Sequence, residues 1–372
     1  MFDSLHIQGF RPFRDLKLTG LGTVNLLVGK NNIGKTAALE GIKMLCSGAA
    51  AMSEVRKLLD IHEEMERDSL EEGESELAWN IGRLFYGESS VTEPPWTRSL
   101  SIGPLGAPQS TLGLELVWVR EKQNDTGEAA LEIVDNLSLF DNAQDLFQAV
   151  ALSFGEVHRR TIKFERFFRY RRYPVRFADR SVGSVNCHFL PARGFPENEV
   201  AVLWDKVVLT DWESVVLDAL GIISPGIDRI SLIESNRRSP GSRVALVRRS
   251  GLQSPEPLKS LGDGMNRIFE MALALVNSRG GVLLVDEVEN GIHYSVQQEL
   301  WSFVFEMAQR LGCQIFATTH SWDCIEAFQR VASSHVAQGA LIRLYQHENE
   351  IDANTFDEHQ LEILTRESIE VR

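Results

Sequence analysis

The feature that most constrains the fold is the octapeptide GKNNIGKT at residues 29–36. It fits the pattern G-x-x-x-x-G-K-[ST], with the apolar residues 24–28 before it and apolar residues at helical spacing over 36–46 after it. A strand that enters a helix through such a loop directs backbone amides and the helix N-terminus at one point, which suits phosphate oxygens. The stretch therefore predicts an α/β protein with a phosphate-binding loop.

Two side chains of this loop are expected to act on a nucleoside triphosphate. Lys35 would neutralise the β- and γ-phosphates, and the Thr36 hydroxyl would hold Mg²⁺. The residues of the loop and helix start that we expect to bind ATP are Asn31, Asn32, Gly34, Lys35, Thr36 and Ala37.

A second segment supplies carboxylates. The apolar run 282–285 reads as a short buried strand, and Asp286 and Glu287 follow it directly. Because consecutive strand residues point to opposite faces, the two carboxylates could share one role only if the backbone turned immediately after Asp286. We expect Asp286 to bind Mg²⁺ through water and Glu287 to polarise the attacking water.

A histidine ends the next predicted strand. The run CQIFATTH closes on His320, which is 33 positions after Glu287 and one helix and one strand later. An imidazole at the C-terminal edge of a sheet beside a phosphate site can donate a hydrogen bond to the γ-phosphate. His320 is therefore a candidate catalytic residue.

The rest of the chain alternates between strand and helix signals. Apolar alternation predicts strands in the first thirty residues, a hairpin of strands over 112–121 and 129–137, and two strands within 227–249. Apolar spacing predicts helices over 142–152, 211–220, 295–311 and 321–330. In the last 110 residues this alternation predicts a parallel sheet with helices on its faces.

Composition excludes several classes of protein. The net charge of −14 argues against coating of nucleic acid through an overall positive field. The four cysteines lack metal-site spacing, and no stretch approaches the ~20 apolar residues that a membrane helix needs. We therefore expect a cytoplasmic protein with no membrane partner.

One local segment departs from this acidic balance. Residues 159–180 contain nine Arg or Lys against one Glu and one Asp, interleaved with aromatic residues. Arginines among aromatics suit phosphate contacts and base stacking, or the acidic face of a partner protein. The alternative is a solvated face without a ligand. The candidate contact residues, called here the central basic patch, are Arg169, Arg171 and Arg172.

Together these motifs carry a family resemblance. GKNNIGKT, SLGDGMNR, LLVDEVENGIH and TTH stand in the order typical of ABC-type ATPases. The chain most resembles the SMC/RecF-like branch, and within it the stand-alone ATPases related to the overcoming-lysogenization-defect (OLD) nucleases. The resemblance covers residues 1–50 and 255–372. It implies an α/β P-loop NTPase fold of the ABC/SMC-head type, with a mixed sheet, an antiparallel lobe and a central, partly helical insertion.

The resemblance also implies how the chain is divided and assembled. A single ATPase domain over 1–372 would comprise a P-loop lobe at 1–50, strands and an insertion at 51–257, and a final lobe at 258–372. In ABC-type ATPases the signature segment of one subunit caps the ATP held by the other, which makes the active form a homodimer or a higher even oligomer. The segment at 260–265, SLGDGM, stands where that signature is found, although transporters of this superfamily read Leu-Ser-Gly-Gly-Gln.

Further roles follow from the same resemblance. Ser260, Gly262 and Gly264 would approach the partner's γ-phosphate, since the glycines permit close approach of the backbone. Arg11, and less strongly Arg14, would approach the nucleotide phosphates. Residues 290–293 occupy the place of the family's D-loop, and no glutamine of the Q-loop type can be assigned.

The expected function is an ATPase with ATP and Mg²⁺ that switches a separately encoded effector, such as a Toprim-like nuclease, in nucleic-acid surveillance or anti-phage defence. DNA or RNA is a candidate ligand. The 52 residues after His320 are too few for a Toprim domain in the same chain. The alternatives are an ATP-sensing binding module with little turnover and the nucleotide-binding subunit of a transporter.

Overall fold

A six-stranded mixed sheet forms the central layer of the computed structural model, which describes residues 1–61, 81–87, 98–123, 129–134, 146–156, 158–164, 182–234, 243–251, 254–335, 338–356 and 360. The strand order is β16-β15-β3-β14-β13-β9, parallel except for the outer strand β16. The bounds are β3 Val24–Val28, β9 Cys187–Leu190, β13 Val282–Val285, β14 Gln314–Thr318, β15 Gly339–His347 and β16 Glu350–Phe356. The carboxyl ends of β3, β13 and β14 therefore lie side by side at one edge.

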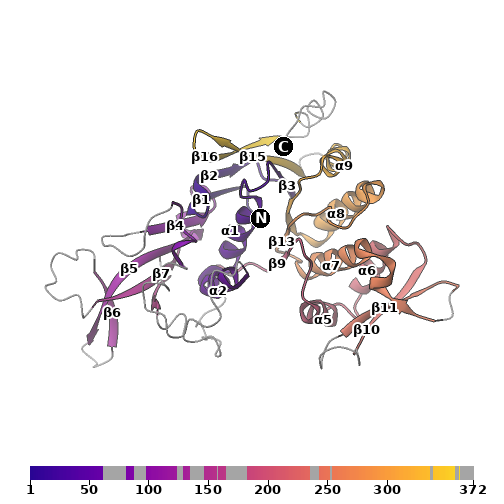
Figure 1. Ribbon diagram of the computed structural model, residues 1–372, viewed down its shortest axis with the longest axis horizontal. Coiled ribbons are helices and arrows are strands. Elements are labelled where there is room, and N and C mark those ends of the chain that lie inside the picture. Colours follow the sequence, from indigo (N-terminus) through magenta and orange to yellow (C-terminus); the bar gives the residue numbers. More distant parts are fainter. Residues whose placement is uncertain are drawn as a thin grey trace.

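Helices cover both faces of this sheet (Figure 1). Helix α1, Lys35–Cys46, lies on one face, and three helices pack on the other: α7 Asp263–Asn277, α8 Gln297–Leu311 and α9 Trp322–Ala332. Strand β13 divides its residues between the two cores, because Val282 and Leu284 pack on the α1 side and Leu283 and Val285 on the α7 side. Burial on both faces explains why this strand reads as a continuous apolar run.

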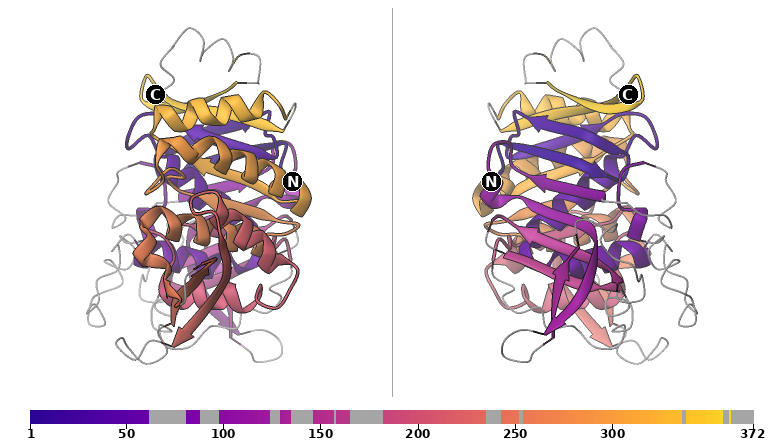
Figure 2. Two further views of the ribbon diagram at one scale, coloured as in Figure 1. Left: turned by 90° about the vertical axis from the view of Figure 1, so that its right-hand side faces the viewer. Right: turned by 90° about the vertical axis from the view of Figure 1, so that its left-hand side faces the viewer.

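An antiparallel sheet forms the next layer, on the far side of α1 (Figure 2, right). Its strand order is β2-β1-β4-β5-β7-β8, and β6 also pairs with β5. The bounds are β1 Ser4–Phe10, β2 Phe13–Thr19, β4 Arg98–Gly103, β5 Leu112–Gln123, β6 Ala129–Ile133, β7 Leu146–Phe154 and β8 His158–Lys163. Its inward residues, among them Leu5, Ile7 and Ile102, share one hydrophobic core with α1.

Smaller elements complete the two lobes. Beside α1 lie a 3₁₀ turn at Gly48–Ala50 and α2, Ala51–Ile61, and another 3₁₀ turn, Pro108–Ser110, precedes β5. Around α7 lie α5 Glu197–Asp205, α6 Trp212–Gly221, β10 Ile227–Glu234, β11 Arg243–Arg249 and β12 Glu256–Pro257. A 3₁₀ turn at Leu258–Leu261 leads into α7, and another at Tyr294–Val296 leads into α8. Among the described residues, no helix has the length and apolar character needed to cross a membrane.

Most of the predicted elements are confirmed. The hairpin is β5 with β6, the two strands within 227–249 are β10 and β11, and the helices expected over 211–220, 295–311 and 321–330 are α6, α8 and α9. The mixed sheet and the antiparallel lobe are also confirmed. The parallel sheet predicted for the last third of the chain also contains β3 and β9, which come from earlier in the sequence.

The helix predicted over 142–152 is wrong. Residues 146–154 form strand β7 between β5 and β8, and residues 142–145 lie outside the described residues. Val150 and Leu152 join the main core of this lobe, whereas Ala149 and Ala151 pack with Val117 on the opposite face. Because both faces are covered, the strand lacks the alternation that distinguishes strand from helix in a sequence.

Candidate nucleotide-binding site

The glycine-rich loop connects β3 to α1 in the predicted order. Gly34 has φ 95° and precedes the first turn of α1, and a Cβ atom there would lie 2.8 Å from Cζ of Phe13 and 2.9 Å from Cγ of Pro12. Only glycine fits a left-handed position packed this closely. The loop is therefore held against the turn between β1 and β2. Asn31 and Asn32 are exposed on it, and Ala37 lies in the first turn of the helix.

Lys35 lies across this loop. Its Nζ donates hydrogen bonds to the carbonyl oxygens of Gly29, at 2.7 Å, and Lys30, at 3.0 Å. Burial lowers the pKa of the Lys35 ammonium, although the charges of Asp286 and of the glutamates beside it act in the opposite sense. An ammonium that is partly desolvated and held at the mouth of the loop is suited to a phosphate anion.

Asp286 connects the loop with the neighbouring strands. The Thr36 hydroxyl lies 3.1 Å from both carboxylate oxygens, and the fully buried Thr318 at the end of β14 donates to Oδ1 at 2.6 Å. A hydroxyl beside a carboxylate is a ligand set that Mg²⁺ accepts, with phosphate oxygens and water as its other ligands. The described part of the chain contains no group of three or more His, Cys, Asp or Glu side chains that could hold a metal ion.

The backbone turns directly after Asp286. Strand β13 ends at Val285, and Glu287 has φ 48°, a left-handed conformation that costs energy for a residue with a side chain. The Glu287 amide donates to Oγ1 of Thr318 at 2.9 Å, which holds this turn on β14. The backbone therefore turns at the position where the sequence pattern made a shared role of the two carboxylates depend on a turn, and the separate roles expected of Asp286 and Glu287 remain a prediction.

Arg267 stabilises the same turn and was not predicted. It lies on α7, in the segment SLGDGMNR, and is only 5% exposed. Its guanidinium donates to the carbonyl oxygens of Asp286 and Glu287, and to that of Pro191 at 2.6 Å. A buried charge held by three carbonyl oxygens ties α7 to the turn at Asp286 and Glu287, called here the acidic turn. The spacing of 19 and 20 residues between these partners gives no local signal in the sequence.

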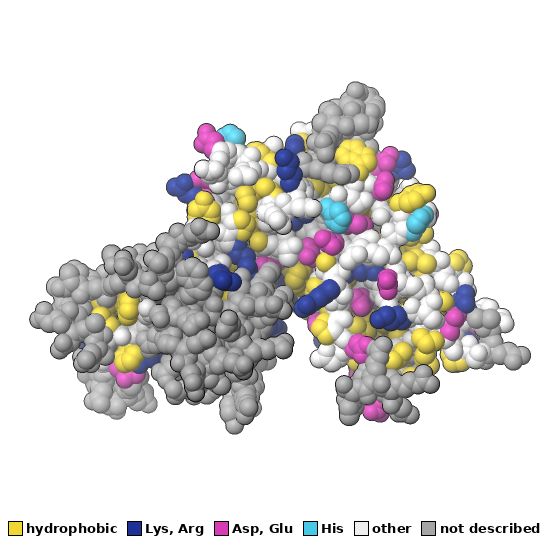
Figure 3. Space-filling view, in the orientation of Figure 1, with side chains coloured by type: hydrophobic (Ala, Val, Ile, Leu, Met, Phe, Trp, Pro, Cys, Tyr) yellow, Lys and Arg dark blue, Asp and Glu magenta, His cyan; other side chains and the backbone are white. Residues whose placement is uncertain are grey.

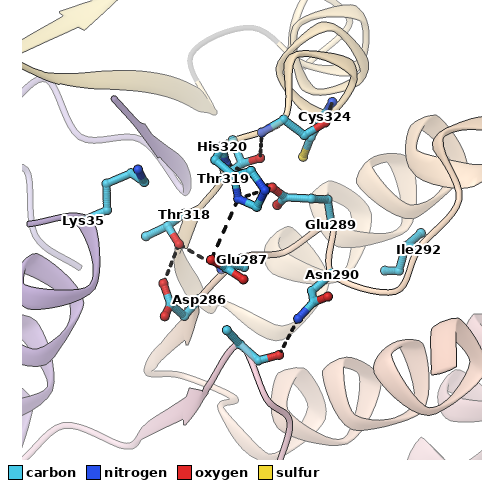
Figure 4. Close-up of polar contacts among 12 residues, drawn as sticks. Lys35, Asp286, Glu287, Glu289, Asn290, Ile292, Thr318, Thr319, His320 and Cys324 are labelled. Atoms are coloured by element: carbon cyan, nitrogen blue, oxygen red, sulfur yellow. Dashed lines mark hydrogen bonds and ion pairs between the residues drawn. The ribbon is translucent and has the colours of Figure 1, made fainter. Parts of the chain in front are cut away.

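His320 follows β14 and faces the acidic turn (Figure 4). Its Nδ1 lies 3.9 Å from Oε1 of Glu287 and 3.2 Å from Oε1 of Glu289. In Figure 4, Lys35 at the start of α1 lies on one side of Thr318 and Asp286, and Glu287 and His320 lie on the other. In Figure 3, which has the orientation of Figure 1, acidic and histidine side chains lie close together near the centre of the molecular surface. The edge of the sheet thus brings together the four predicted groups Lys35, Asp286, Glu287 and His320.

Glu289 is a further residue of the site that sequence reasoning missed. It is 9% exposed, and its Oε1 accepts the backbone N–H of His320 at 3.0 Å in addition to its contact with the ring. The next residue, Asn290, donates through Nδ2 to the carbonyl oxygen of Ala192 at 2.9 Å. The D-loop assignment of residues 290–293 remains a prediction. A carboxylate two positions after Glu287 was the available signal for Glu289.

The signature-like segment lies at the start of α7. Gly262 has φ 106° and precedes the helix, and both Gly262 and Asp263 are exposed. Ser260 donates to the carbonyl oxygen of Pro257 at 2.6 Å. A Cβ atom on Gly264 would lie 2.6 Å from the carbonyl oxygen of Gly291, so the close approach expected of this glycine is made within the chain. The exposed helix N-terminus remains accessible to an anion.

The arginines expected near the phosphates have other partners. Arg11 has φ 49°, and its Nε lies 3.0 Å from Oε2 of the buried Glu40 on α1. Arg14 donates to Oε1 of Glu350 at 2.5 Å. Contact of Arg11 with phosphate remains a prediction. The central basic patch lies outside the described residues.

Comparisons with known proteins agree with this site. Residues 4–150 match a family described as "AAA domain", and residues 216–323 match one described as "AAA domain, putative AbiEii toxin, Type IV TA system". The first match includes the glycine-rich loop, and the second includes the signature-like segment, the acidic turn and His320.

Individual relatives are distant. An "ATP/GTP phosphatase" of Helicobacter pylori is 20% identical over 358 residues, which cover 89% of this chain and 88% of that protein. The "Uncharacterized protein MJECL10" of Methanocaldococcus jannaschii is 39% identical over 91 residues, 24% of this chain and 34% of that protein. An SMC head solved with the C-winged helix domain of ScpA is similar with a TM-score of 0.49 at 11% identity, over 95% of this chain and 97% of that one. Two segments of the chain, residues 4–150 and 216–323, are thus similar to AAA-domain families, and together they contain the glycine-rich loop, the acidic turn and His320.

Proposed function

We propose that the chain hydrolyses ATP at a site completed by a second copy of itself. The observation that carries this proposal is the convergence of Thr36, Asp286, Glu287 and His320 at one edge of the central sheet. The name of the Helicobacter relative, ATP/GTP phosphatase, supports hydrolysis as the reaction. Under this proposal the whole chain acts as one cytoplasmic ATPase domain.

The side chains divide the reaction between them. Lys35 and the loop amides bind and orient the β- and γ-phosphates. Glu287 accepts a hydrogen bond from the attacking water and so orients it toward the γ-phosphorus. His320 donates a hydrogen bond to a γ-phosphate oxygen as negative charge develops there. Thr36 and Asp286 would hold Mg²⁺, which supplies charge neutralisation between the phosphates.

A second copy would supply the missing cap over the γ-phosphate. The exposed N-terminus of α7, with Gly262 and Asp263 on the surface, offers backbone amides to an anion outside its own chain. Ser260 adds a hydroxyl, which now donates to Pro257 and would exchange that partner for phosphate. Two copies arranged head to tail would close two equivalent sites, which makes the active form a dimer or a higher even oligomer.

ATP-driven closure would then switch a separately encoded effector, and we propose a nuclease of the Toprim type acting in nucleic-acid surveillance or anti-phage defence. The resemblance of the sequence motifs to those of the OLD-related ATPases and the toxin–antitoxin description of one matched family support this context. DNA or RNA bound by the central basic patch is the proposed trigger.

The decisive experiment separates water activation from nucleotide binding. Glu287→Gln is expected to retain Mg²⁺ and ATP but to stall hydrolysis, which leaves a dimer locked by ATP. Light scattering with and without ATP measures this dimer, and phosphate release measures turnover. A mass that does not respond to ATP would reject closure as the mechanism.

Variants of the cap provide the matched control. Ser260→Arg places bulk and positive charge against the neighbour's γ-phosphate, so the double variant with Glu287→Gln should remain monomeric with ATP. Ser260→Arg alone should bind ATP but not turn it over. Mixed with Lys35→Ala chains, it should regain up to about half the activity per dimer, because both changes fall on one of the two sites.

A second candidate function is ATP sensing with little turnover. It is favoured if the wild type closes on ATP but releases phosphate slowly both with and without DNA and effector. The intact pair Asp286 and Glu287 is the observation that favours hydrolysis instead.

A further inference from the structure

Glu289 is a buried carboxylate with an unusual set of contacts. It is 9% exposed, and one oxygen, Oε1, lies 3.0 Å from the backbone nitrogen and 3.2 Å from the ring Nδ1 of His320. Its other oxygen, Oε2, is buried and has no hydrogen-bond partner among the described residues. A carboxylate buried with half of its acceptors unpaired is costly, so packing alone does not account for its presence.

The contacts of Oε1 restrict His320 in two ways. The bond to the backbone N–H fixes the turn that follows β14, and the bond to the ring fixes how the imidazole is rotated on that turn. An oxygen without hydrogens can only accept, so this contact selects the state of the ring that carries a proton on Nδ1. The nitrogen left to meet a phosphate is then Nε2. It donates to a phosphate oxygen only in the ring form that is protonated on both nitrogens, and the Glu289 carboxylate accepts from Nδ1–H in that form as well.

Glu287 also lies near this ring but is placed differently. Its Oε1 is 3.9 Å from Nδ1, beyond hydrogen-bond distance, and its side chain is much more exposed than that of Glu289. The two glutamates therefore have different roles, since the nearer, buried one holds the ring and the farther one remains available for water.

We infer that Glu289 is the positioning residue of His320: it accepts the proton of Nδ1–H and so directs Nε2 toward the γ-phosphate, to which Nε2 donates when the ring is protonated on both nitrogens. This inference rests on the proposed function for its effect on the rate. The arrangement itself can be tested without nucleotide. Glu289 touches neither substrate nor reacting atoms and acts only through His320.

The first test is the protonation of the ring in the complete chain. Spectra of protein labelled with ¹⁵N-histidine, with the His320 signal assigned by its absence in His320→Ala, should show a proton on Nδ1 in the wild type. Glu289→Leu should move the proton to Nε2, and Glu289→Gln should keep it on Nδ1, because the amide oxygen accepts both bonds. The control Glu270→Gln changes another half-buried carboxylate, on α7, and should leave the ring unchanged.

The second test is kinetic. Glu289→Leu should lower kcat by about 10- to 100-fold, the usual effect of removing a partner that orients a functional histidine, and change KM for ATP by less than about threefold. Glu289→Gln should restore most of kcat. In the His320→Ala background, Glu289→Leu should have no further effect, since two residues that act through one group are not additive.

The outcomes are distinguishable. A wild-type ring with its neutral proton on Nε2, an unchanged ring in Glu289→Leu, or additive losses in the double variant would each overturn the role of Glu289. If Glu289→Leu does not fold, the spectra of the wild type and of Glu289→Gln still show which ring nitrogen of His320 carries the proton, and so test the role of Glu289. A wild type that does not hydrolyse ATP would refute the proposed function but not the positioning role, which the spectra test alone.

Discussion

His188 is expected to make the stability of the folded chain sensitive to acid. This residue lies in β9, and its Nδ1 is 3.2 Å from Oγ of Ser278. Burial, together with the positive charges of Lys43 and Lys206, lowers the pKa of His188 to about 4 from its ordinary 6.5. The unfolded chain therefore takes up a proton at this residue near pH 6.5, whereas the folded chain does so only near pH 4.

The difference in the pKa of His188 between the folded and unfolded states makes the free energy of unfolding depend on pH. Since the unfolded state binds more protons between these two values, the contribution of His188 to stability is present above pH 6.5 and is lost as the pH falls toward 4. At pH 5 the loss relative to pH 8 is about 2 kcal/mol. His188→Gln keeps a polar side chain but removes the titration, so its free energy of unfolding should fall less on acidification.

The assay compares urea unfolding of the wild type and His188→Gln at pH 8 and at pH 5. Other titrating groups act on both proteins and cancel in the difference between the two pH effects. The wild type should lose about 2 kcal/mol more than the variant. Equal losses in the two proteins would refute the inference that His188 remains neutral in the folded state.

The remaining predictions concern the nucleotide site and the central basic patch. Lys35→Ala should abolish ATP binding in calorimetry, because no other described ammonium lies across the loop; retention of tight binding would contradict the role of the loop. Thr318→Val keeps the shape but removes two hydrogen bonds that hold the acidic turn, so kcat should fall roughly tenfold or more and the Mg²⁺ requirement should rise, both measured by phosphate release. Reversal of the three arginines of the central basic patch to glutamate should weaken DNA binding and flatten its salt dependence; unchanged titrations at low and high salt would support a solvated face instead.

The parts of the site that depend on local sequence could be predicted. Lys35 and Thr36 lie in a continuous motif whose geometry is fixed by the strand before it and the helix after it. The two faces of a strand made a turn after Asp286 the condition for a shared role of the two carboxylates, and the φ of 48° at Glu287 shows that the backbone does turn there.

The residues that hold this local geometry could not be predicted, because their contacts join distant parts of the chain. Thr318 reaches Asp286 and Glu287 across 32 and 31 positions, and Arg267 reaches the same turn from α7. Neither residue has a spacing that a motif would reveal. Strand β9 was missed for a similar reason: four residues are too short for a clear pattern, and its partner β13 comes almost a hundred residues later.

The division of β13 between two hydrophobic cores has a thermodynamic consequence. The same four residues, Val282–Val285, fill space on the α1 side and on the α7 side, and Asp286 follows them without a linker. The two lobes therefore share a cooperative unit and are not expected to unfold in separate steps. A loss of side-chain volume in either core would be partly relieved by a shift of this strand, and even a small shift moves the carboxylate at its end. Substitutions far from the phosphate loop can therefore change the rate of the reaction, because β13 is packed on both faces and carries Asp286 at its end.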